Sequence, residues 1–145
     1  MVIEESLFIN ADLNKVWKTF TDLTYWKDWN TVMRNVCSDE KCIAPGSEVR
    51  CSFRHLFFPV KAEIMVEEVI PYESIVWSAR KKGFLVRNRF SFQRQDRGVL
   101  VTSRESFTGF FVKAFGFFLP VKRMRSMIAA FLKDLKTASE GQFIL

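Results

Sequence analysis

The feature that most restricts the fold of this sequence is a change in hydrophobic period near residue 107. From Val32 to Phe107 apolar and polar side chains tend to alternate, and from Val121 to Leu135 apolar residues recur every three or four positions. Alternation is typical of strands with one buried face, and a spacing of three or four is typical of an amphipathic helix. The chain should therefore form an antiparallel sheet with a long helix on its apolar face.

Turn sequences divide the alternating region into short segments. Examples are Ala44-Pro45-Gly46 and Asp96-Arg97-Gly98, which favour tight reversals of the chain. The predicted strands span residues 32–39, 48–55, 60–70, 74–80, 84–94 and 98–107. Because the connections are short, we expect successive strands to pair in an antiparallel meander.

A strand and two short helices are predicted before this region. Residues 2–9 alternate, and Asp12 occupies the N-cap position of a helix that carries Val16, Trp17 and Phe20 at helical spacing. A second short helix holds Tyr25, Trp26 and Trp29. The length of 145 residues favours a single domain over residues 1–145.

The catalytic and metal-binding side chains are few. The sequence has one histidine, His55, and none of the glycine-rich phosphate-binding, nucleophile-elbow or zinc-protease motifs. Cys37, Cys42 and Cys51 would need His55 to complete a metal site, and small side chains that happen to be cysteine explain them more simply. We expect no metal and no cofactor. The basic residues are spread along the chain without a nucleic-acid motif, so nucleic acid is not expected as a partner.

Three groups of residues carry a resemblance to a known family. They are Val16-Trp17 with Asp22 ahead of the YWKDW segment at 25–29, the turn and strand from Val69 to Trp77, and Glu105 to Gly109. With them the whole chain resembles the START/Bet v 1-like helix-grip superfamily, also called SRPBCC, which includes the polyketide cyclase/dehydrase and lipid-transport group. The resemblance implies an α+β fold: a seven-stranded antiparallel sheet curled around a long C-terminal helix, with two short helices after the first strand and a cavity between sheet and helix.

Inward-facing positions on the strands and on the long helix provide the candidate ligand-binding residues. They are Phe53, His55, Trp77, Asn88, Phe90, Ser103, Glu105, Phe107, Met124, Met127 and Phe131. The apolar members would also be needed in any folded core. Glu105 and Asn88 are more informative, because burial without a partner costs several kcal/mol. Glu105 either pairs with an arginine near a strand end or contributes to the cavity.

One end of the sheet carries an unusually apolar set of turns. Alternate connections of a meander lie at the same end, which should bring together the turns after His55, Arg80 and Phe107. Phenylalanines with lysines and arginines around them are typical of segments that dock on anionic membranes. The candidate docking residues are Phe57, Phe58, Phe84, Phe110 and Phe111. The alternative is that residues 110–119 fold back and plug the mouth of the cavity.

The leading hypothesis is a carrier or sensor that binds a hydrophobic small molecule or lipid, with peripheral contact to an anionic membrane. A cyclase/dehydratase-like enzyme is the first alternative, with Glu105 and His55 as acid or base and Asn88 orienting a substrate carbonyl. A chaperone-stimulating interaction module is the second alternative, because the superfamily includes such a branch. The N-terminal sequence and the odd number of cysteines favour the cytoplasm and reduced thiols. The sequence leaves the oligomeric state open.

Overall fold

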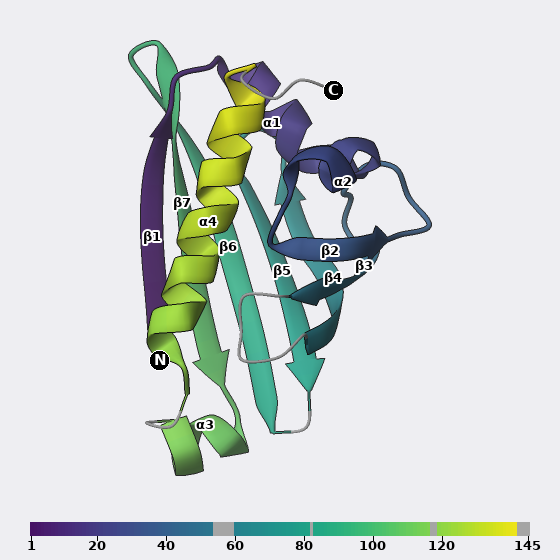
Figure 1. The fold of residues 1–145 in the computed structure, drawn as a ribbon, viewed down its shortest axis with the longest axis vertical. Helices are drawn as coiled ribbons and strands as arrows, with labels where there is room; N and C mark the ends of the chain where they lie inside the picture. The colour runs from purple at the N-terminus through teal and green to yellow at the C-terminus, as the bar shows by residue number, and fades with distance from the viewer. Residues whose placement is uncertain (54–59, 82, 117–118, 142–145) are drawn as a thin grey trace.

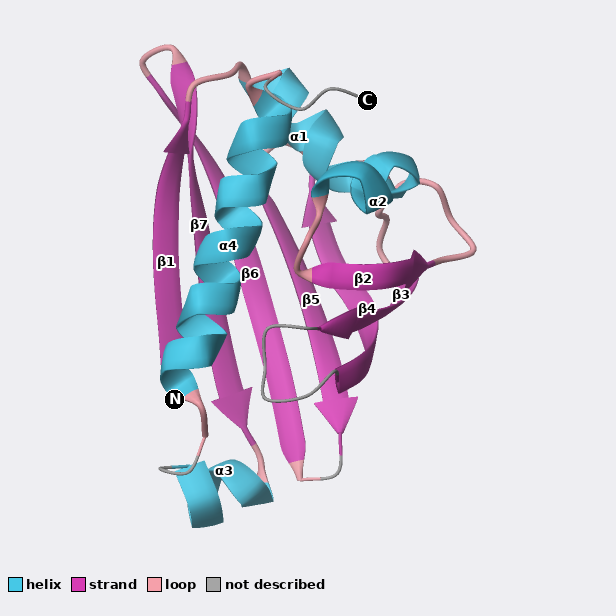
Figure 2. Ribbon diagram, in the orientation of Figure 1, coloured by secondary structure: helices cyan, strands magenta, loops and turns pink. Residues whose placement is uncertain are grey.

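A computed structural model describes residues 1–53, 60–81, 83–116 and 119–141. In it a seven-stranded antiparallel sheet curves around a long C-terminal helix (Figures 1 and 2). The strands are β1 (Val2–Ile9), β2 (Met33–Cys37), β3 (Glu48–Phe53), β4 (Val60–Ile70), β5 (Ser74–Lys81), β6 (Phe84–Gln95) and β7 (Gly98–Thr108). The helices are α1 (Leu13–Thr21), the 3-10 turn η1 (Leu23–Tyr25), α2 (Trp26–Trp29), α3 (Phe110–Phe115) and α4 (Val121–Ser139).

The sheet order confirms the expected meander. Strands β2 to β7 are neighbours in sequence order, and β1 pairs with β7 at the far edge. Strands β4 to β7 begin and end within one residue of the predicted bounds. The strand predicted for 32–39 is shorter, because its pairing with β3 shifts between Arg34 and Cys37, where Asn35 has a positive φ of 54°. Residues 54 and 55 of the strand predicted for 48–55 lie outside the described residues.

The first helix starts where the sequence predicts. The Asp12 side chain accepts a hydrogen bond from the Lys15 backbone N–H at 2.8 Å, which satisfies one of the free N–H groups of the first turn. Val16, Trp17 and Phe20 are the buried residues of this helix, and they lie on one face at helical spacing.

An aromatic cluster joins this helix to the sheet and to α4. The Phe20 ring lies 4.9–6.1 Å, centroid to centroid, from the rings of five neighbours, which are Trp26, Trp77, Phe90, Phe92 and Phe131. These side chains come from α2, β5, β6 and α4. The Trp26 indole N–H donates to the Phe20 carbonyl at 2.9 Å, so the one polar atom of this buried ring is satisfied.

Polar contacts fasten α4 across the sheet. Arg125 donates to the Glu5 carboxylate at 2.8 Å, and Lys136 donates to the Phe8 carbonyl, both on strand β1. On the other side Asp134 accepts hydrogen bonds from the backbone N–H and the hydroxyl of Thr31, just ahead of β2. The helix is therefore held to elements at both edges of the sheet and runs between these edges (Figure 1).

Helix α3 stands at the lower end of the molecule in Figure 1 and was not predicted from the sequence. Gly109, which precedes it, has a φ of 116°, a conformation that side chains with a Cβ rarely adopt. A Cβ at Gly109 would lie 2.5 Å from the Gly83 carbonyl oxygen. The turns after β5 and β7 therefore touch, as expected from the meander, and the turn after His55 lies outside the described residues.

No helix in the described ranges is long and apolar enough to span a membrane.

Candidate functional site

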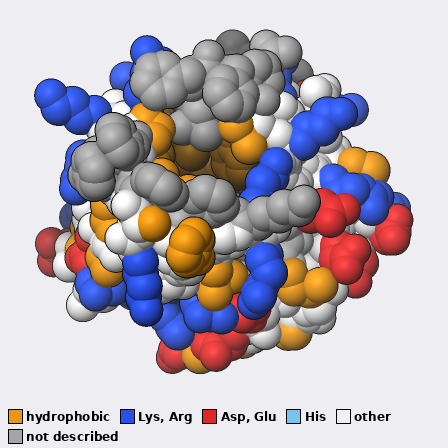
Figure 3. Space-filling model, turned by 90° about the horizontal axis from the view of Figure 1, so that it is seen from below, with side chains coloured by type: hydrophobic (Ala, Val, Ile, Leu, Met, Phe, Trp, Pro, Cys, Tyr) orange, Lys and Arg blue, Asp and Glu red, His pale blue; other side chains and the backbone are white. Residues whose placement is uncertain are grey.

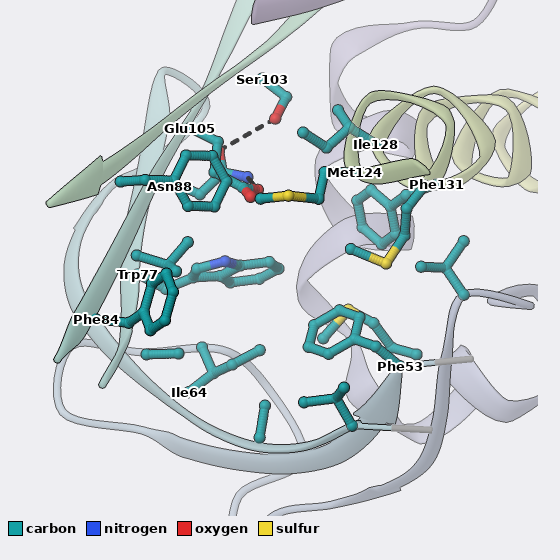
Figure 4. Close-up of a pocket in the computed structure, with 18 of the residues that line it drawn as sticks. Phe53, Ile64, Trp77, Phe84, Asn88, Ser103, Glu105, Met124, Ile128 and Phe131 are labelled. Carbon is teal, nitrogen blue, oxygen red and sulfur yellow. Dashed lines mark hydrogen bonds between the residues drawn. The ribbon is translucent and has the colours of Figure 1, made fainter. Parts of the chain in front are cut away.

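The inner face of the sheet and α4 enclose a cavity of about 430 Å³. Side chains from β2 to β7 form one wall, and α4 with the residues just before it forms the other (Figure 4). Nearly all the lining side chains are apolar, and a volume of this size lies within the range of roughly 300–1,000 Å³ typical of small-molecule sites.

The structure brings together most of the residues that the sequence analysis selected. Ten of the eleven candidate ligand-binding residues line this cavity, and His55 lies outside the described residues. The wall also contains residues outside the list of eleven candidates, of which Ala79, Phe84 and Val86 were expected on inward faces: Val32, Met33, Val60, Ala62, Ile64, Ala79, Lys81, Phe84, Val86, Leu119, Pro120 and Ile128. Several of them lie at inward-facing positions of the strands or on the apolar stripe of α4, so the sequence pattern could have identified them. Leu119 and Pro120 carry no periodic signal, so only the folded chain places them.

A polar cluster of three residues interrupts the apolar wall. Strand register places Glu105 of β7 directly opposite Asn88 of β6. Ser103 lies two residues before Glu105, on the same face of β7. The Asn88 amide N–H donates to Glu105 Oε2 at 3.0 Å, and the Ser103 hydroxyl donates to Asn88 Oδ1 at 3.1 Å. Figure 4 shows this cluster on one side of the cavity, near Met124 and Ile128 of α4.

Glu105 has the most perturbed environment in the cavity. Burial raises the pKa of its carboxyl from 4.5 to about 7, while the Asn88 hydrogen bond acts in the opposite direction. The expected alternative, pairing with an arginine, does not occur among the described residues. Arg87 and Arg104 lie next to this cluster in sequence, but they point outward and pair with Glu67 and Glu4. The Glu105 carboxyl can therefore gain or lose a proton near neutral pH.

The cavity is closed at one end and open at the other. Trp77, Phe90 and Phe131, which belong to the aromatic cluster around Phe20, form part of its wall. Figure 3, viewed from the α3 end, shows a hollow with hydrophobic side chains inside it and Lys and Arg side chains spread around it. The last residue of β5, Lys81, and Leu119, which lies just before α4, contribute to the lining.

The candidate docking residues divide between the cavity and the surface. Phe84 is half-buried and lines the cavity, whereas the Phe110 side chain is 71% exposed. Phe57 and Phe58 lie outside the described residues, as does the side chain of Phe111. Within residues 110–119, the Phe110 side chain is exposed and Leu119 contributes to the cavity wall.

The described part of the chain holds no cluster of three or more His, Cys, Asp or Glu side chains placed to bind a metal ion. Cys37 and Cys42 are exposed and Cys51 is buried, and none of the three forms a disulfide.

Comparison with known proteins identifies the family. The sequence profile of the family described as polyketide cyclase/dehydrase and lipid transport matches residues 1–140. The chain belongs to this family. No curated protein sequence is similar enough to count as a match.

Solved structures of low sequence identity show that the chain has the Bet v 1-like helix-grip fold. A hypothetical protein of Helicobacter pylori is 20% identical with a TM-score of 0.77, over 96% of this chain and 88% of that one. A protein of Thermus thermophilus is 14% identical with a TM-score of 0.79, over 98% and 99%. Norcoclaurine synthase of Thalictrum flavum, solved with dopamine and hydroxybenzaldehyde, is 11% identical with a TM-score of 0.76, over 100% and 89%.

The raised pKa of Glu105 predicts how stability depends on pH. Between pH 4.5 and about 7 the folded protein keeps a proton that the unfolded chain has released, so the free energy of unfolding falls as pH rises through this window. Glu105→Gln removes the ionisable group and should raise the free energy of unfolding at pH 8 by up to about 3 kcal/mol, since one pKa unit corresponds to about 1.4 kcal/mol. At pH 4.5 the variant and the wild type should differ little.

Urea denaturation of both proteins at a series of pH values measures this effect. Glu63→Gln is the matched control, because Glu63 is an exposed carboxylate on β4 that does not line the cavity. A Glu105→Gln variant whose stability follows the wild-type pH profile would contradict the prediction.

Proposed function

We propose that the protein binds a hydrophobic small molecule or lipid in the cavity between the sheet and α4. The observation that carries this proposal is an apolar space of about 430 Å³ in the middle of the fold. Protein interiors normally pack as densely as organic crystals, and an unfilled apolar cavity lowers the stability of the protein in proportion to the cavity volume. A large apolar cavity with a few converging polar groups is typical of a ligand site.

Filling the cavity should weaken ligand binding. Val86 lines the cavity and Leu85, the preceding residue of β6, does not. Val86→Trp places an indole inside the cavity, so we expect binding of the uncharged fluorescent probe N-phenyl-1-naphthylamine to weaken by at least about tenfold, or about 1.4 kcal/mol. Leu85→Trp is the matched control, and it should bind like the wild type.

Native mass spectrometry of protein purified without detergent gives a second measurement. We expect an apolar adduct on the wild type and on Leu85→Trp that is lost from Val86→Trp, and organic extraction would identify it. Equal probe affinity in all three proteins would place binding outside this cavity and contradict the proposal.

An enzyme of the cyclase/dehydratase type is the second candidate, and Glu105 is the observation that favours it. A carboxyl with a pKa of about 7 in a water-poor cavity suits a general acid or base at neutral pH. An enzyme would release its bound molecule chemically changed, and Glu105→Gln should then lower turnover by about 100-fold or more. Full turnover in that variant would remove Glu105 as the acid or base.

We also propose that the end of the molecule near α3 contacts anionic membranes. Phe110 is 71% exposed there, and Lys81, Lys113 and Lys122 are exposed at the same end. An exposed phenylalanine can enter the headgroup boundary, and each lysine near an anionic surface contributes about 1 kcal/mol. Since the hollow in Figure 3 is at this end, docking would bring the cavity mouth to the lipid.

Vesicle flotation tests this contact. We expect the wild type to bind phosphatidylserine-containing vesicles more than neutral phosphatidylcholine vesicles, and Phe110→Ser and Lys113→Ala each to weaken this binding several-fold. Tyr25→Ser is the matched control, because Tyr25 is an exposed aromatic residue at another part of the surface. Equal binding to both vesicle types, or no loss in Phe110→Ser, would refute the contact.

The three cysteines are all free thiols, which supports a reducing compartment such as the cytoplasm as the place of action.

A further inference from the structure

We propose that the ligand carries its polar group as a hydrogen-bond donor, a hydroxyl or an amine, that contacts Glu105, and that ligands with a carboxylate bind poorly. This inference rests on the proposed binding function and specifies the ligand class of the same cavity.

The hydrogen bonds within the polar cluster leave one carboxyl oxygen of Glu105 for a ligand. Glu105 Oε2 accepts from Asn88, whose amide oxygen in turn accepts from Ser103. Among the described residues, no hydrogen bond reaches the other carboxyl oxygen, Oε1, although Glu105 is only 9% exposed. Oε1 is not among the fully buried side-chain atoms that lack a hydrogen-bond partner, and the Glu105 side chain lines the cavity. The open hydrogen-bonding position therefore faces the space where a ligand would lie.

The described side chains around Glu105 supply no positive charge. In the row of paired residues across the sheet, Glu105 lies between Asn88 on β6 and Ile3 on β1. Met124 and Ile128 are the nearby cavity-lining residues of α4 (Figure 4). Among the described residues, Lys81 is the only other ionisable side chain in the cavity lining, and it is exposed.

Eight other charged residues of these strands, of α4 and of the neighbouring β4 form the pairs Arg87–Glu67, Arg89–Glu68, Arg104–Glu4 and Arg125–Glu5. No described charged residue of β1, β6, β7 or α4 other than Glu105 lines the cavity. A ligand carboxylate beside Glu105 would therefore meet a like charge without a compensating cation, which disfavours binding in a poorly solvated site.

A donor group fits both protonation states of this site. A hydroxyl can donate to the ionised carboxylate and can accept from the protonated acid, while an ammonium group donates and also supplies the missing positive charge. Within the cluster, one of the two Asn88 amide N–H groups and the Asn88 amide oxygen are already hydrogen-bonded.

Three probes on one aromatic frame test the proposal: naphthylmethanol, naphthylmethylamine and naphthoate. Affinities would be measured by isothermal titration calorimetry at pH 6 and pH 8 for the wild type, Glu105→Gln and the Glu63→Gln control. At pH 8 we expect the wild type to bind the alcohol or the amine at least about tenfold more tightly than naphthoate, a difference of about 1.4 kcal/mol. Glu105→Gln should strengthen naphthoate binding several-fold, and Glu63→Gln should change none of the affinities.

The pH dependence gives an independent readout. Lowering the pH from 8 to 6 protonates Glu105, so naphthoate affinity should rise in the wild type and stay constant in Glu105→Gln. If Glu105→Gln loses more affinity for the amine than for the alcohol, the preferred donor is cationic. If it loses more affinity for the alcohol, the preferred donor is neutral.

Two outcomes separate this inference from the proposed function. If all three probes bind the wild type alike and Glu105→Gln changes nothing, the cavity binds ligands but the role of Glu105 is refuted. If no probe binds at millimolar concentration to any of the three proteins, the binding function fails and this inference fails with it.

Discussion

The packing of aromatic rings around Phe20 is the interaction on which the rest of the structure depends. Phe20 comes from a short helix near the N-terminus, and the rings around it come from α2, β5, β6 and α4. Each such ring pair contributes about 0.5–1.5 kcal/mol beyond the burial of its area. Because one ring contacts so many elements, a single cluster fixes the distance between the sheet and the long helix at one end. It also closes that end of the cavity, and the space farther along α4 stays open.

An open cavity requires that the helix be held in place by something other than dense packing beneath it. In this protein the contacts at the two edges do so: Arg125 and Lys136 reach β1, and Asp134 reaches Thr31. Surface ion pairs usually contribute little. Here their value is in position, since they join α4 to two edges of a curved sheet. Because the cavity is kept open at a cost in stability, a binding function explains it better than imperfect packing does.

The polar cluster gives this cavity its individual chemistry within a family whose members share a fold and differ in function. Asn88 and Ser103 orient the Glu105 carboxyl but leave one oxygen without a partner. Burial keeps its pKa near 7, so small changes in pH or in ligand charge shift its protonation. A carrier and an enzyme would use the same group differently, the first as a hydrogen-bonding anchor and the second to move a proton.

The sequence by itself determined the element order, the inward parity of the strands and most of the cavity wall, because alternation and helical spacing are local properties of the chain. It also identified Glu105 and Asn88 as polar residues on a buried face. Only the tertiary structure decided that they are partners, because that depends on the register between β6 and β7. Helix α3 and the place of Leu119 in the wall were likewise decided by folding, since a short segment without periodicity takes its position from the surfaces it meets.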